Sequence, residues 1–194
     1  MKDNLKLIIP FLKFESKDDF YYLQILQRKK ENPEIGSNSR VIKNYYISSV
    51  EYLEMRYDEI KKLCELFNAR ASIRLNRRSY RKVGMKTMVN VANTMMNEEY
   101  EFLNKSYDRA CGLGHNDTEK KWILDLDGEY TYQQLMEMED IVNNSDPLGK
   151  NGIIYIPSKT GLHYITKPFD PRKLKENFPE IEIHKDNPTN LYIP

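Results

Sequence analysis

The sequence predicts an α+β fold in which a sheet is covered by helices mainly on one face. Three observations lead to this prediction: helical and strand periodicities alternate along the chain, two apolar stretches flank a turn at residues 158–161, and strands become more frequent after residue 115. A soft boundary near residue 115 separates a helix-rich α/β unit, residues 1–115, from a strand-rich unit, residues 116–194. The second unit alone would bury a marginal core, so we expect one compact domain overall.

The first unit opens with a predicted helix over residues 20–27, which the polar residues at 16–19 can cap. The alternation in Val41–Ile47 predicts a strand. Ser48 with Glu51 then predicts a capping box for an amphipathic helix. The apolar residues of that helix recur at helical spacing: Val50, Leu53, Tyr57, Ile60, Leu63, Cys64 and Phe67.

A strand and two helices complete this unit. In Ala71–Asn76 the apolar side chains share one face, whereas Ser72, Arg74 and Asn76 share the other. The next helix has an apolar stripe that we interpret as core filling, namely Met85, Met88, Val89, Ala92, Met95 and Met96. A second helical piece, residues 98–110, ends at the glycine-containing segment 111–114.

The second unit begins with a short apolar strand, Lys121–Asp127, and Thr131 with Gln134 predicts a capping box before the next helix. Gly152–Pro157 and Leu162–Thr166 form the predicted hairpin. The remaining elements are a short helix starting at Asp170-Pro171 and two strands, Ile181–His184 and Leu191–Ile193.

Composition excludes several classes of protein. With 30 basic and 29 acidic residues the net charge is +1, which excludes a globally basic nucleic-acid binder but allows a local basic patch. Two cysteines cannot build a disulfide framework or a cysteine-based zinc site. No apolar run approaches the ~20 residues of a membrane span, and no signal-peptide cleavage site follows the N-terminal apolar run. We therefore expect a cytoplasmic protein without a membrane partner.

The sharpest motif is the strand Trp122–Asp127 with its following glycine. Residues two apart on a strand point the same way, so Asp125 and Asp127 share a face. Two neighbouring carboxylates repel each other unless a cation lies between them, and oxygen ligands favour Mg²⁺ or Mn²⁺. The alternative is a strand end whose acids cap the following turn.

The hairpin turn is a candidate anion site. Ser158, Lys159 and Thr160 can present backbone N–H groups and one cation to a phosphate. On the strand that leaves the turn, alternation places His163 and Lys167 on one face. The alternative is an ordinary polar turn with a hydrogen-bonded histidine.

Two further segments are candidates for the same chemistry. Glu182, His184 and Asp186 share a strand face and could supply a third carboxylate, although a solvated edge strand is the alternative. The basic run could hold nucleic-acid phosphates, or it could be a solvated charged face. It contains Arg70, Arg74, Arg77, Arg78, Arg81 and Lys82, with Tyr80 among them.

In combination these motifs resemble those of the archaeo-eukaryotic primase superfamily, which includes the primase-polymerases. The matching segments are an apolar strand ending in Asp125-Leu126-Asp127, the run Ser158–His163, and an acid on a hydrophobic strand, Ile181–Ile183 or, less neatly, Asp186. The resemblance covers Trp122–Pro194 and, for residues 1–115, only the order of elements. It implies an RRM-like mixed or antiparallel sheet backed by an N-terminal α/β unit.

The resemblance also implies an activity: a metal-dependent nucleotidyltransferase that uses nucleoside triphosphates on a single-stranded nucleic-acid template. Asp125, Asp127 and either Glu182 or Asp186 would bind Mg²⁺ or Mn²⁺. The triphosphate would be held by Ser158, Lys159, Thr160, His163 and Lys167. Template contacts would come from Arg74, Arg77, Arg78 and Arg81. For such a small core we also expect a partner, namely a helicase or another replication subunit.

Two alternatives remain open. Asp125–Glu129 also looks like the start of a haloacid-dehalogenase-like phosphatase, in which Asp125 would be the nucleophile. That family needs a doubly wound fold, and few residues follow the motif. The other alternative is a non-catalytic nucleic-acid-binding or partner-binding module of a virus or mobile element, favoured by the basic run and the ambiguous third acid.

Overall fold

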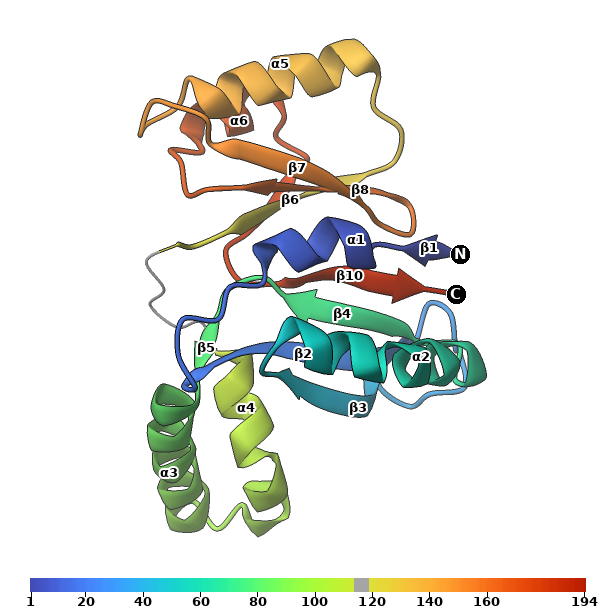
Figure 1. Cartoon of the computed structure of the whole chain (residues 1–194), viewed down its shortest axis with the longest axis vertical. Helices are drawn as coiled ribbons and strands as arrows, with labels where there is room; N and C mark the ends of the chain where they lie inside the picture. The colour runs from blue at the N-terminus through green and yellow to red at the C-terminus, as the bar shows by residue number, and fades with distance from the viewer. Residues whose placement is uncertain (114–118) are drawn as a thin grey trace.

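The structure is a computed structural model that describes residues 1–113 and 119–194. It has the predicted α+β architecture, with helices packed on two antiparallel sheets (Figure 1). The boundary predicted near residue 115 falls in residues 114–118, outside the described residues. No described helix combines the length and the hydropathy that a membrane crossing requires.

The first sheet has the strand order β1-β10-β4-β2-β3, and β5 pairs with β2. Every pairing in it is antiparallel. Its strands are β1 (Lys2–Asp3), β2 (Asp19–Arg28), β3 (Ser39–Ile47), β4 (Arg70–Arg74), β5 (Arg78–Ser79) and β10 (Pro188–Ile193).

Helix α2 (Val50–Leu66) packs on one face of this sheet, with α1 (Leu5–Ile8) and the short 3₁₀ helix η1 (Ile9–Phe11) in the same core. The helix begins after Ser49, whose side chain accepts a hydrogen bond from the Tyr52 amide at 3.0 Å. The predicted cap, Ser48, was therefore one residue too early. The predicted apolar stripe is confirmed, because its central members are fully or almost fully buried: Leu53, Tyr57, Ile60 and Cys64.

The helix predicted over residues 20–27 is wrong, because this segment is strand β2. Both faces of the strand are buried. Leu23 and Ile25 point into the core beneath α2, whereas Phe20 and Tyr22 belong to a second cluster on the opposite face. A strand covered on both faces reads as a nearly continuous apolar run, which also satisfies helical spacing.

Helix α3 (Tyr80–Met96), the 3₁₀ helix η2 (Tyr100–Lys105) and α4 (Ser106–Gly112) form a helical hairpin at one end of the molecule (Figure 1). The prediction that the methionine stripe fills a core is wrong. Met88 is 60% exposed and Met96 is 80% exposed. The buried residues of α3 are Val83 and Thr94, because this narrower face of the helix packs on the rest of the hairpin.

The second sheet has the order β7-β8-β6-β9 and is also antiparallel throughout. Its strands are β6 (Trp122–Asp127), β7 (Gly152–Pro157), β8 (Gly161–Thr166) and β9 (Glu182–His184). Helices α5 (Tyr132–Asn143) and α6 (Arg172–Asn177) cover one face. The predicted hairpin is confirmed, and Leu124 and Leu126 point toward the helices as alternation required.

The opposite face of the second sheet packs toward the first. Ile123, Ile156 and Ile165 belong to the same core as Ile8 and Leu191. After β9 the chain crosses through residues 185–187 into β10, which pairs with β4. The last strand of the described chain therefore completes the first sheet, and the two sheets share one core.

The predicted capping box of α5 is confirmed. The Thr131 hydroxyl accepts from the Gln134 amide at 3.3 Å, and the Gln134 side chain accepts from the Thr131 amide at 2.9 Å. Thr131→Ala is expected to lower the free energy of unfolding by about 1 kcal/mol, because it leaves a helix N–H without its partner. Denaturant unfolding measures this change. Gln133→Ala, on the same helix, is the control and should change stability by less than about 0.5 kcal/mol.

Candidate functional site

A cleft of about 500 Å³ lies between the two sheets. One wall is built from the helix-free face of the second sheet and carries Asp125, Asp127 and His163. The other wall comes from the first sheet and the segment after β2, and it carries Arg28 and Arg70. The cleft thus brings an acidic wall and a basic wall face to face.

Strand register explains how the acidic wall forms. Asp125 on β6 is paired with His163 on β8 and with Glu182 on β9. Paired residues of antiparallel strands project from the same face, so the three side chains form a row across the sheet. Asp127 follows two residues along β6 and joins the same face. All four are candidates from the sequence and line the cleft, whereas Asp186, the other candidate for the third acid, does not.

His163 is held between two polar groups. Its Nδ1 lies 2.8 Å from the Thr189 hydroxyl oxygen, and its Nε2 lies 3.5 Å from Asp125 Oδ1. Burial lowers the pKa of His163, and the nearby Asp125 carboxylate opposes this shift. Because a carboxylate only accepts hydrogen bonds, we assign the proton of the neutral ring to Nε2, with the Thr189 hydroxyl donating to Nδ1.

His184 is a site residue to which the sequence assigned no role beyond a shared strand face. Its Nε2 lies 3.4 Å from Glu182 Oε2 and 3.9 Å from Asp125 Oδ2. The His184 side chain is 25% exposed. His184 therefore lies between two carboxylates of the acidic wall.

The turn between β7 and β8 closes one end of the cleft. The Thr160 hydroxyl donates to Asp127 Oδ1 at 2.8 Å, and Ser158 Oγ accepts from the Gly161 amide at 3.1 Å. A Cβ on Gly161 would lie 1.9 Å from the Leu126 carbonyl oxygen, so only glycine allows this close approach to β6. The turn is thereby fixed beside the acidic wall, with Ser158, Lys159 and Thr160 lining the cleft.

The basic wall is organised by Glu31, which the sequence did not single out. Arg70 Nε donates to Glu31 Oε2 at 3.1 Å, its Nη2 pairs with Oε1, and Lys159 Nζ lies 2.7 Å from that oxygen. The Glu31 side chain is only 10% exposed. Arg28 was missed because it ends the strand β2 that the sequence predicted as a helix. A single carboxylate thus neutralises cations from both sides of the cleft.

Several predicted site residues lie elsewhere. Asp186 does not join the acidic wall but pairs with Arg78, whose Nη2 lies 2.6 Å from Asp186 Oδ2. Arg74 lies 3.6 Å from the same oxygen, and Arg77 pairs with Glu15 at 3.0 Å. These three arginines were predicted as template contacts, but their side chains are at most 16% exposed. Arg74 and Arg78 thus share Asp186, and Arg77 pairs with the exposed Glu15 and with Asp19 at 3.4 Å, so all three arginines have acidic partners within the protein.

Lys167 and Arg81, which were also predicted as site residues, do not line the cleft either. Lys167 follows the end of β8, and its amide donates to the Asn151 carbonyl at 2.8 Å. Arg81 is exposed in the first turn of α3, where its amide donates to Asp18 Oδ1 at 2.8 Å. Neither residue is brought near the acidic wall by the sheet register.

The carboxylates of the acidic wall could hold a divalent cation whose remaining coordination positions are filled by a bound ligand and water. Within residues 1–113 and 119–194, no three His, Cys, Asp or Glu side chains form a complete metal centre. Mg²⁺ ordinarily takes one or two carboxylates and completes its shell with water and substrate phosphates. Asp125 and Asp127, on one strand face, supply such a pair of carboxylates.

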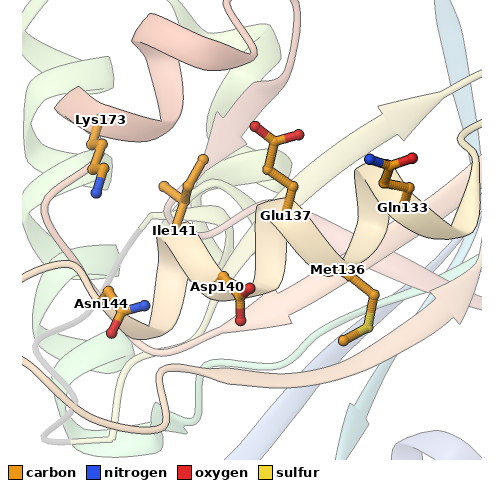
Figure 2. Close-up of a pocket in the computed structure, with 7 residues that line it drawn as sticks. All are labelled: Gln133, Met136, Glu137, Asp140, Ile141, Asn144 and Lys173. Atoms are coloured by element: carbon orange, nitrogen blue, oxygen red, sulfur yellow. The ribbon is translucent and has the colours of Figure 1, made fainter.

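A second hollow lies along the outer side of α5 (Figure 2). Six of its seven side chains come from α5 and the residue after it, and Lys173 comes from α6. Its acids, Glu137 and Asp140, face no histidine, and none of the sequence motifs contributes to it. The cleft between the sheets is therefore the better candidate.

No protein-family model, no curated protein and no solved structure matches this chain. The assignment of function accordingly depends on the geometry and chemistry of the cleft.

Proposed function

We propose that the protein is a metal-dependent nucleotidyltransferase of the primase-polymerase type, which adds nucleotides from nucleoside triphosphates on a nucleic-acid template. The observation that carries this proposal is the row His163–Asp125–Glu182, with Asp127 beside it, facing Arg28 and Arg70 across one cleft. Carboxylates that can hold cations, placed opposite basic groups, suit a triphosphate carrying Mg²⁺ or Mn²⁺.

Each wall has its own part in the proposed reaction. Asp125 and Asp127 would hold the cation, and water and the triphosphate would complete its coordination shell. The bound cation would neutralise charge that develops on the transferred phosphoryl group and on the leaving pyrophosphate. His163, oriented by Thr189, would turn its Nε2–H from Asp125 to a phosphate oxygen once Asp125 holds the cation.

The basic wall would take the triphosphate. In the structure Arg70 and Lys159 share the Glu31 carboxylate. A triphosphate offers the same kind of anionic oxygen atoms with more charge, so it can replace Glu31 as their partner. Arg28, at the same wall, adds a third cation within the cleft lining.

The arrangement of the second sheet supports the proposed RRM-like unit. Strands and helices follow in the order β6-α5-β7-β8-α6-β9, with both helices on one face and β6 and β8 in the centre. This strand-helix-strand-strand-helix-strand order is that of the ferredoxin-like motif. By contrast, the phosphatase alternative requires a doubly wound parallel sheet, whereas every strand pairing among the described residues is antiparallel.

Template-directed synthesis tests the proposal. A labelled primer annealed to a defined single-stranded template is incubated with Mn²⁺ or Mg²⁺ and either ribo- or deoxynucleoside triphosphates. We expect incorporation of the complementary nucleotide and no incorporation after chelation of the metal, because the cation organises the triphosphate.

A template with a changed first base is the control, and it should change which nucleotide is added. Binding of single-stranded nucleic acid without incorporation of any nucleotide would favour the non-catalytic module. Release of phosphate from a simple ester without a template would favour a hydrolase.

A further inference from the structure

An apolar stripe is exposed along α3, although the chain as a whole is strongly polar. The exposed fractions are 60% for Met85, 60% for Met88, 49% for Val89, 49% for Met95 and 80% for Met96. With the exposed Ala92 these residues recur at intervals of three and four, so they form one continuous seam on the helix. Such a seam is the surface that another helix covers.

Within residues 1–113 and 119–194, the stripe stays exposed. The opposite side of α3 is already fixed, because Val83 and Thr94 are buried and Asn90 Nδ2 donates to the Ser106 carbonyl at 3.2 Å. At 100° per residue, the centre of the stripe lies about 175° around the helix from this fixed face. In Figure 1 α3 runs along the outer edge of the molecule, with α4 on its inner side.

The charges at the two ends of the stripe are opposite in sign. Arg81, Lys82 and Lys86 lie at the start of α3, which contains no acid. Glu98, Glu99 and Glu101 follow its last residue, and all three are exposed. The surface therefore has a basic end, an apolar middle and an acidic end.

We propose that this stripe binds a second copy of the same chain, with the two α3 helices antiparallel. An antiparallel pair centred between Val89 and Ala92 places Met85 opposite Met96. It also brings the basic start of one α3, with Arg81, to the end of the other α3, which Glu98 and Glu99 follow. The two-fold axis repeats each basic-to-acidic contact, which makes the interface self-complementary.

Light scattering coupled to size-exclusion chromatography tests the proposal. The mass is expected to approach twice the chain mass of 23.1 kDa as concentration rises. Met88→Glu is expected to weaken association at least about tenfold, because it puts a charge into the apolar seam. Met55→Glu, at an α2 methionine that is 67% exposed, is the matched control and should leave the mass unchanged.

Charge reversal identifies the partner and the orientation. Arg81→Glu with Lys86→Glu makes both ends acidic, and Glu98→Lys with Glu99→Lys makes both ends basic, so each variant alone should be monomeric. Mixing the two variants should restore a complex of both. A wild-type mass that stays at one chain, or an absence of pairing in the mixture, would overturn the proposal. The proposal would also be overturned if the wild-type chain bound anionic vesicles without self-associating and Met88→Glu abolished this binding. The stripe would then be a membrane-binding surface.

Discussion

Asp125→Asn is expected to reduce template-directed nucleotide incorporation by about a thousandfold. Asp125 lies at the centre of the acidic row and has neighbours on both adjacent strands, so its charge influences every proposed ligand position. Removing a cation ligand costs several kcal/mol of transition-state stabilisation, and about 4 kcal/mol corresponds to this factor. Single-nucleotide incorporation under saturating triphosphate measures it.

Asp58→Asn is the matched control, because Asp58 lies on α2 with its side chain 84% exposed. It should retain the rate of the unchanged protein, and both variants should keep the same thermal stability within a few degrees. Unchanged incorporation by Asp125→Asn would exclude the acidic row as the catalytic centre, whatever activity the protein has.

Arg78→Met is expected to lower the free energy of unfolding by about 3 kcal/mol. Arg78 is 1% exposed, and its guanidinium donates to Asp186, to the Cys111 carbonyl at 2.9 Å and to the Asn76 carbonyl at 2.7 Å. Removing one member of a buried ion pair leaves the other charge without compensation. Arg74 and Asn76 still contact Asp186, so the loss should stay at the lower end of the range for such pairs.

Denaturant titration measures this loss, and Arg40→Met on the exposed part of β3 is its control, with a change of less than about 0.5 kcal/mol expected. A double variant, Arg78→Met with Asp186→Leu, should lose less free energy of unfolding than the two single changes added together, because it removes both charges of the Arg78–Asp186 pair at once. A loss of under about 1 kcal/mol in Arg78→Met would contradict a structural role for this ion pair.

The acidic row was partly predictable from the sequence because strand parity is a local rule. Alternation alone places Asp125 and Asp127 on one face and Leu124 and Leu126 on the other. The identity of the third acid was not predictable. It depends on where β9 ends, and the turn after His184 carries Asp186 away to Arg78.

The largest errors have a common physical cause, which is that burial depends on partners distant in sequence. From the sequence, Arg74 and Arg78 were predicted to form a basic surface. In the structure both contact Asp186, which lies over a hundred residues later in the chain. The same holds for β2, whose second buried face exists only because α3 and α4 pack against Phe20 and Tyr22. For the methionine stripe the error is the reverse, because buried residues were predicted and exposed ones are found. An apolar pattern shows that burial would be favourable, but it does not show that another element covers the residues.

The short crossing from β9 to β10 limits how the cleft can move. Residues 185–187 connect β9 of the acidic wall to β10 of the first sheet, and Asp186 among them pairs with Arg74 and Arg78. A shared core behind the cleft adds to this constraint. We therefore expect the two walls to move little relative to each other. If the cleft binds a triphosphate as proposed, we expect the ligand to enter past Glu31 and Lys159, whose ion pair would have to break first.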